Sequence, residues 1–314
     1  MNWDTDEIVR AVLSEILHPD GKGDFTFPLY NATRQVGIGV RSTGELVLML
    51  PQQNDAEAFE AKYAQYNPAV DLYQPGQAVD VVTRSLLYCQ FEPDDLGQIQ
   101  AIAAVFAGLV SLEKSTKDTA QAIWAMKGLF DSGFNPQVSK EAVKGLFGEL
   151  AVLNEFEFSD EIIRAWHSDP NSKFDITSGN ARIEVKTTAG SVREHHFSEG
   201  QVPGPGNVAC FVASVMLQVV ETGGLTLGEY LFDIQKSLSP AHFQKVLQTS
   251  AEYLNANPFS IQKPRVDIPG TLGNIRYFKS PSVPHPNGSP GTSDISWKAN
   301  LAGLEAEASR PTLS

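Results

Sequence analysis

The stretch FDITSGNARIEVKTT, residues 174–188, decides the fold of this chain. Residues 174–177 and 182–188 are rich in strand-forming side chains. The segment between them contains Gly179 and Asn180, which tolerate the positive φ angles of a tight turn. The pattern therefore predicts a β-hairpin.

The second strand of this hairpin carries an acid and a base on one face. Alternate side chains of a strand share a face, so Ile183 and Val185 point one way and Glu184 and Lys186 point the other. If Asp175 on the first strand turns to the same side as Glu184, two carboxylates and one ammonium group converge near the turn.

Such a cluster suggests a divalent cation. Two carboxylates at close range repel each other, and a single lysine offsets that repulsion only in part. Mg²⁺ prefers oxygen ligands and leaves positions for water and for substrate phosphate. An ordinary ion pair on a solvated hairpin is the alternative interpretation, because an isolated D…ExK pattern is common.

The spacing from Asp175 to Glu184-Val185-Lys186, with eight residues between the two acids, resembles the metal-binding core of the PD-(D/E)XK nuclease superfamily. That superfamily also places an acidic residue on a preceding helix, and the segment KGLFGEL, residues 144–150, supplies Glu149. With Ala165-Trp166-His167 added, the pattern is similar to an uncharacterised bacterial family of PD-(D/E)XK motif proteins. Its members are often encoded near restriction or phage-defence genes, and the resemblance covers roughly residues 110–300.

The resemblance implies a metal-dependent endonuclease that cleaves DNA with Mg²⁺ or Mn²⁺. Asp175 and Glu184 would bind the metal, and the backbone carbonyl of Val185 would add a ligand. Glu149 would support a second ion or orient a metal-bound water. Lys186 would position or activate the attacking water and stabilise charge on the phosphate.

Further polar residues follow the core. Members of the family carry an Arg-x-His run and a Gln-Leu pair after it, whereas this chain has Arg193-Glu194-His195-His196 and Gln201-Val202. The second element is therefore only half matched. Gln201 is a candidate to orient Lys186 or contact the phosphate, and Arg193 and His195 are candidate nucleic-acid contacts for which surface solvation is the alternative.

The order of the expected elements predicts the fold class. A mixed α/β (α+β) fold of the restriction-endonuclease-like kind, with a sheet flanked by helices, accounts for this order. Residues 1–112 are expected to form a smaller, acidic α+β domain with an antiparallel sheet, and residues 113–314 the nuclease-like domain. Around the hairpin, the expected elements are a helix at 139–156, strands at 162–166 and 208–220, and helices at 226–235 and 240–254.

Charge argues against unspecific binding of phosphates. The chain has 24 Lys and Arg against 37 Asp and Glu, a net charge of −13, and residues 1–120 carry 8 of the former against 17 of the latter. A DNA surface must then be a local patch, and the acidic N-terminal part is expected to dock a partner protein. A homodimer is a further expectation. The alternative function is a catalytically silent nuclease-fold module that binds a partner protein or nucleic acid in a defence complex.

Other classes of protein fit the sequence poorly. The N-terminal residues lack the basic start and apolar core of a signal peptide, and the apolar runs are too short and too interrupted to cross a bilayer. Cys89 and Cys210 fit neither a disulfide framework nor a zinc site, and HExxH, GxSxG and P-loop motifs do not occur. A cytoplasmic protein without membrane partners is expected.

Overall fold

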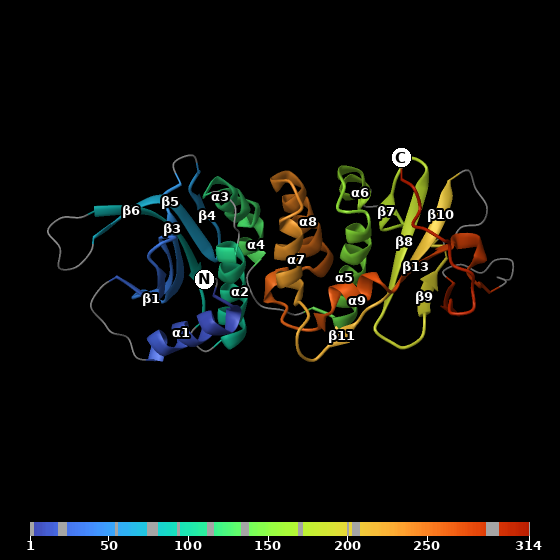
Figure 1. Ribbon diagram of the computed structural model, residues 1–314, viewed down its shortest axis with the longest axis horizontal. Helices are drawn as coiled ribbons and strands as arrows, with labels where there is room; N and C mark the ends of the chain where they lie inside the picture. The colour runs from blue at the N-terminus through green and yellow to red at the C-terminus, as the bar shows by residue number, and fades with distance from the viewer. Residues whose placement is uncertain are drawn as a thin grey trace. The chain divides into compact units, whose positions relative to one another are not determined.

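The chain divides into two compact units in the computed structural model (Figure 1). Unit 1 consists of Met1–Gln137 and Gly228–Gln262, and unit 2 consists of Val138–Leu227 and Lys263–Ser314. The structure describes residues 3–17, 24–53, 56–73, 81–92, 95–111, 116–132, 138–168, 172–199, 201–202, 208–286 and 295–313.

Unit 1 is built on an antiparallel sheet of six strands in the order β1-β2-β3-β6-β5-β4. The central strand β3 is buried along most of its length because it alternates apolar side chains to both faces. The strands are β1 (Phe25–Asn31), β2 (Val36–Arg41), β3 (Glu45–Pro51), β4 (Phe59–Glu60), β5 (Ala64–Tyr73) and β6 (Val81–Gln90).

The helices of unit 1 come from two separate parts of the chain. Gly108, on a helix of the first part, lies against the ring of Phe232, on a helix of the second, and only a residue without a side chain fits there. The ring of Phe232 in turn lies 4.8 Å from that of Phe259. The helices are α1 (Thr5–Leu17), α2 (Leu96–Ser111), α3 (Thr116–Ala125), α4 (Lys127–Ser132), α7 (Leu227–Gln235), α8 (Pro240–Leu254) and the 3₁₀ turn η1 (Pro258–Ser260).

Unit 2 contains a mixed sheet in the order β13-β10-β8-β7. Strands β8 and β10 are parallel, and the outer pairs are antiparallel. The sheet strands are β7 (Ile176–Thr177), β8 (Ala181–Thr188), β10 (Ala209–Met216) and β13 (Ile275–Lys279). The helices of unit 2 are α5 (Lys140–Glu155), α6 (Asp160–Ala165), α9 (Ile268–Leu272) and the 3₁₀ turn η2 (Ser280–Ser282). Two further strand pairs are β9 (Glu194–Ser198) with β14 (Ser296–Asn300) and β11 (Val219–Val220) with β12 (Arg265–Val266).

The predicted hairpin forms β7 and β8. Ile176 pairs with Ile183, and the Ser178 N–H donates to the Ala181 carbonyl at 2.9 Å across the turn. Strand β7 has only two residues and its pairing with β8 covers Arg182 and Ile183. From Glu184 onward, β7 therefore leaves this edge of β8 open.

Different layers cover the two faces of the unit 2 sheet. Helix α5 runs along one face (Figure 1), where Gly148 lies directly against Thr187 of β8. The ribbon β9–β14 covers the other face, where Phe197 packs with Val212 and Phe278. Because Val212 is the register partner of Glu184, Glu184 and Lys186 point toward this ribbon.

The prediction of a strand at residues 162–166 is wrong, because Asp160–Ala165 forms helix α6. Two β-branched isoleucines suggested a strand, but Ser159 stands at the N-cap position, Asp160 and Glu161 lie in the first turn and Arg164 in the last. These charges match the helix dipole. Only Trp166, just after the helix, makes the strand-like bridge, to Ile176.

The predicted fold class is confirmed as a mixed α+β structure whose sheets are flanked by helices. The compact units differ in extent from the expected domains, because residues 113–137 and 228–262 belong to unit 1 together with the N-terminal part. Among the helices in the described part of the chain, none is long and apolar enough to cross a membrane.

The contact between Gly148 and Thr187 gives a stability prediction. A Cβ at position 148 would collide with the Thr187 side chain, so Gly148→Ala should lower the free energy of unfolding by about 1–3 kcal/mol. Gly128 of α4 has open space around it, and Gly128→Ala should instead stabilise the protein by about 0.5–1 kcal/mol. Urea unfolding measures both changes.

Adding Thr187→Ala to Gly148→Ala should recover part of the loss, because the nearest atom to the new methyl group is the Thr187 hydroxyl. Equal stability of Gly148→Ala and the wild type would show that α5 does not pack this closely on β8.

Candidate metal and catalytic site

The site is built at the open edge of β8. Asp175 lies just before β7, and its Oδ2 accepts a hydrogen bond of 2.7 Å from the Val185 N–H. The N–H and C=O of one strand residue leave on the same side of the strand. The Val185 carbonyl, a predicted metal ligand, therefore faces the Asp175 side rather than β10.

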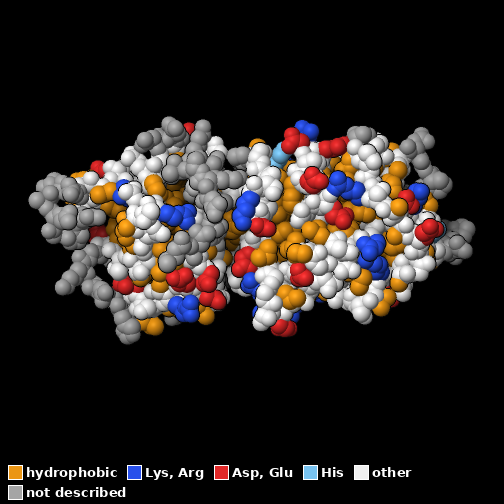
Figure 2. All heavy atoms as spheres, viewed as in Figure 1, with side chains coloured by type: hydrophobic (Ala, Val, Ile, Leu, Met, Phe, Trp, Pro, Cys, Tyr) orange, Lys and Arg blue, Asp and Glu red, His pale blue; other side chains and the backbone are white. Residues whose placement is uncertain are grey.

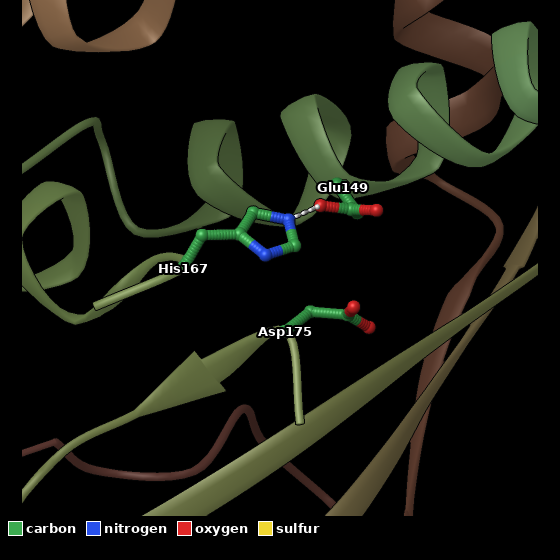
Figure 3. Close-up of side chains that lie close together, drawn as sticks. All are labelled: Glu149, His167 and Asp175. Carbon is green, nitrogen blue, oxygen red and sulfur yellow. Dashed lines mark hydrogen bonds and ion pairs between the residues drawn. The ribbon is translucent and has the colours of Figure 1, made fainter. Parts of the chain in front are cut away.

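Glu149 approaches this edge from α5. Its side chain is buried, and its Oε2 accepts a hydrogen bond of 2.7 Å from Trp166 Nε1. The same oxygen lies 2.8 Å from His167 Nε2. Figure 3 shows the His167 ring directed at Glu149, with the Asp175 carboxyl group below both in this view. Glu149 thus faces the hairpin, as the sequence predicted.

His167 lies beside Glu149 and Asp175, although no role was predicted for it from the sequence. Its N–H donates to the Asp175 carbonyl at 2.8 Å, and its backbone has a positive φ of 43°. One ligand atom from each of Glu149, His167 and Asp175 lies within 4.8 Å of the other two. The adjacent bridge between Trp166 and Ile176 fixes this arrangement, so a contact that is distant in sequence places His167 in the site.

Glu184 occupies the other face of β8 and is 3% exposed. Its Oε1 accepts a hydrogen bond of 2.6 Å from Gln201 Nε2 and lies 2.8 Å from Lys186 Nζ. Its Oε2 is buried and has no hydrogen-bond partner among the described residues. One carboxylate oxygen is thus doubly paired, while the other is unpaired.

Lys186 is held from three sides. Its Nζ pairs with Glu184, donates to Gln201 Oε1 at 3.0 Å, and lies 5.5 Å from the centre of the Phe197 ring. Gln201 Oε1 also accepts a hydrogen bond of 3.0 Å from the Ser198 N–H. Gln201 therefore bridges Lys186 and Glu184 from the end of β9, and Phe197 is a further neighbour that the sequence did not indicate.

Burial and neighbouring negative charge favour the neutral forms of the Asp175 and Glu184 carboxyl groups. Burial raises the pKa of Asp175 well above its usual value, and the charges of Glu149 and Glu184 raise it further. Burial likewise raises the pKa of Glu184 to about 7, although Lys186 acts in the opposite direction. Three acids in one buried region are the electrostatic situation that a bound cation relieves.

The structure arranges the predicted residues as two groups that meet at Asp175 and Val185. Glu149 lies on the α5 side, and Glu184, Lys186 and Gln201 form a connected cluster on the β9 side. The two groups interact electrostatically, because the charges of Glu149 and Glu184 both raise the pKa of Asp175.

Arg193 and His195, the candidate nucleic-acid contacts, both make hydrogen bonds within unit 2. Arg193 donates to the Ser214 carbonyl and to the Asn274 carbonyl, both at 2.7 Å. His195 is 3% exposed, and its Nε2 lies 2.7 Å from Ser214 Oγ. These contacts attach β9 to β10 and to the start of β13, and they leave His195 buried and Arg193 half-buried.

The residues fit a divalent cation. The unpaired buried Oε2 of Glu184 lacks a positive partner, and leaving a buried acceptor unsatisfied costs about 1–3 kcal/mol. Asp175 and the Val185 carbonyl supply further oxygen donors at the same edge. Oxygen donors from carboxylates and backbone suit Mg²⁺ and Mn²⁺.

Comparison with known proteins agrees with this geometry. Residues 110–257 match a protein family described as "Putative PD-(D/E)XK family member, (DUF4420)". All of the predicted site residues and His167 fall inside the matched segment. The resemblance to the PD-(D/E)XK superfamily that the sequence indicated is confirmed. No curated protein and no solved structure matches the chain.

The buried His195 gives a pH prediction. Burial lowers its pKa to about 4 from 6.5, and the charges of Lys186 and Arg193 act in the same direction. The unfolded chain therefore takes up the proton first as the pH falls below about 6.5, which removes stability from the folded state. Between pH 7 and 5, the wild type should lose about 1–2 kcal/mol more than His195→Gln.

Urea unfolding at the two pH values measures this difference. The contributions of the carboxyl groups to the pH dependence cancel in the comparison, because these groups titrate in both proteins. His196→Gln is the matched control, since His196 is the exposed neighbour on β9. If His195→Gln keeps the pH dependence of the wild type, His195 is not buried in the neutral form.

Proposed function

We propose that this protein is a metal-dependent phosphodiesterase, an endonuclease that cleaves DNA with Mg²⁺ or Mn²⁺. PD-(D/E)XK proteins are usually nucleases, and the matched segment contains the whole candidate site. A role in restriction or phage defence is part of this proposal, and the sequence resemblance is its support.

The observation that carries the proposal is the state of Glu184. Most buried side-chain polar atoms have a hydrogen-bond partner, and an unpaired oxygen on a buried glutamate calls for an explanation. Here Lys186 and Gln201 both hold Oε1, and Oε2 is left without a partner among the described residues. This arrangement orients the carboxylate for a cation, and Asp175 and the Val185 carbonyl complete the oxygen donors.

Lys186 would act on the reacting phosphate. Its ammonium group is the cation of the β9-side cluster, and Gln201 fixes its position through Oε1. From there the lysine donates hydrogen bonds to the attacking water or to the phosphate oxygens on which charge develops. Gln201 acts as a positioning residue, because its amide joins Lys186 and Glu184.

The cation itself supplies acidification of bound water and neutralisation of phosphate charge when it is bound. Asp175, Glu184 and the Val185 carbonyl would hold it, and Glu149 would lie beside it. The pKa of Asp175 is raised by burial and by the charges of Glu149 and Glu184. A cation bound beside these three acids would reduce their mutual repulsion.

Partners and setting form part of the same proposal. DNA is the proposed substrate, bound at a local patch of unit 2 in the cytoplasm. The acidic N-terminal part is proposed to dock a partner protein, because its 17 acids against 8 bases in residues 1–120 repel a phosphate backbone. A homodimer would let two sites cut two strands.

The second candidate function is a catalytically silent module that binds a partner protein or nucleic acid. The charge distribution favours it: the chain has a net charge of −13, and Figure 2 shows Lys and Arg side chains scattered among acidic ones on the face drawn. Nuclease folds can host binding functions. The intact cluster of Glu184, Lys186 and Gln201 favours the enzyme.

Replacement of Lys186 tests the chemistry. Lys186→Ala removes the ammonium group but leaves Asp175 and Glu184, so the variant should fold and still bind Mn²⁺. Its cleavage of supercoiled, linear or single-stranded DNA should fall by about 10²–10³-fold, since a positioned electrostatic donor is lost. Lys298→Ala removes an exposed lysine of β14 and should leave the rate unchanged.

Unchanged cleavage by Lys186→Ala would mean that the hairpin is not the catalytic centre. The silent-module proposal would then replace the endonuclease.

Replacement of Asp175 tests the metal. Asp175→Asn keeps an acceptor for the Val185 N–H but removes one charge. The wild type should gain about 2.7 kcal/mol of stability at Mg²⁺ or Mn²⁺ concentrations 100 times the dissociation constant. The variant should gain much less, and Asp233→Asn, at an exposed position of α7, should match the wild type. Equal thermal shifts in all three proteins would exclude a cation at Asp175.

A further inference from the structure

We propose that Glu149, His167 and Asp175 form a second cation position, beside the one at Asp175 and Glu184, with the His167 imidazole as a nitrogen ligand. This position would consequently prefer Mn²⁺, or another divalent first-row transition ion, over Mg²⁺. This inference rests on the proposed function, because it names the class of cation that the proposed site takes.

The distances suit metal ligation. Adjacent ligands around an octahedral ion at 2.0–2.1 Å stand about 3 Å apart. His167 Nε2 and Glu149 Oε2 are 2.8 Å apart. One ligand atom from each of Glu149, His167 and Asp175 lies within 4.8 Å of the ligand atoms of the other two. The three donor atoms therefore converge on one small volume.

The three ligands come from separate elements that are fixed to one another. Glu149 belongs to α5, which packs on β8 through Gly148. The His167 N–H donates to the Asp175 carbonyl, so the backbones that carry these two ligands are directly joined. The side chain of His167 is 31% exposed, whereas that of Glu149 is 4% exposed. An ion can thus enter on the His167 side and reach a buried carboxylate.

A second observation points to a cation near these three residues. Glu184 is 3% exposed, and its Oε2 is buried without a hydrogen-bond partner among the described residues. The charge of Glu149 raises the pKa of the Glu184 carboxyl group and that of His167 lowers it, so Glu184 interacts electrostatically with two of the three ligands. Two cations that share Asp175 would use both sets of donors, as in two-metal sites whose ions are about 3.5–4 Å apart.

The donor set decides the choice of cation. Mg²⁺ requires oxygen ligands, whereas imidazole favours the transition ions, and affinity at a mixed nitrogen and oxygen site rises from Mn²⁺ along the first row. The simplest alternative is that His167 only pairs with Glu149 and stabilises the helix. The two interpretations differ in whether a nitrogen nucleus contacts the bound metal.

The test uses the full-length protein and Mn²⁺ itself. Electron spin echo spectroscopy of the Mn²⁺ complex should show ¹⁴N coupling from a directly bound imidazole in the wild type and in His196→Gln. The coupling should vanish in His167→Gln, which keeps a hydrogen-bond donor for Glu149. Calorimetry should show Mn²⁺ affinity falling by about 10–100-fold in that variant, and Mg²⁺ affinity changing less than about threefold.

The outcomes separate this inference from the proposed function. Mn²⁺ binding without ¹⁴N coupling in the wild type overturns ligation by His167 and leaves the Asp175–Glu184 position intact. Absence of any Mn²⁺ binding overturns both. The wild-type spectrum decides the question even if His167→Gln does not fold.

Discussion

The hydrogen bond from the Val185 N–H to Asp175 Oδ2 is the interaction on which the site depends. Strand β7 begins only at Ile176, the partner of Ile183, so the edge of β8 beyond Ile183 would expose unpaired backbone groups. The Asp175 side chain takes the place of the missing strand at this edge. The Asp175 carboxylate thereby lies on the same side of β8 as the Val185 carbonyl, the proposed metal ligand. Asp175 also stands between the α5 side and the β9 side of the sheet.

Packing on both faces of β8 buries several acidic side chains close to one another near this edge, which is electrostatically unfavourable. Helix α5 brings Glu149 close through the contact of Gly148 with Thr187, and the β9–β14 ribbon covers Glu184 and Lys186. Burial raises the pKa of Asp175 and Glu184, and one lysine does not compensate three acids. A fold selected only for stability would avoid such a cluster, because buried charges without partners are costly. Cation binding would explain why these acidic side chains lie together in a buried region.

The sequence predicted the hairpin, the alternation of Glu184 and Lys186, and the approach of Glu149, because these features follow from local periodicity and from one amphipathic helix. His167 could not be assigned, since its position depends on the bridge between Trp166 and Ile176. The membership of residues 228–262 in unit 1 likewise depends on contacts such as Gly108 with Phe232, which are distant in sequence. Helix α6 was missed because two isoleucines outweighed the capping and charge signals around them.

The central claim is that the open edge of β8 binds a divalent cation through Glu184. An anomalous difference map from crystals grown with Mn²⁺ tests it most directly. The account predicts a peak about 2.2 Å from Glu184 Oε2, with Asp175 and the Val185 carbonyl as further ligands. A well-ordered, metal-free Glu184 in crystals whose Mn²⁺ is bound elsewhere would contradict the account.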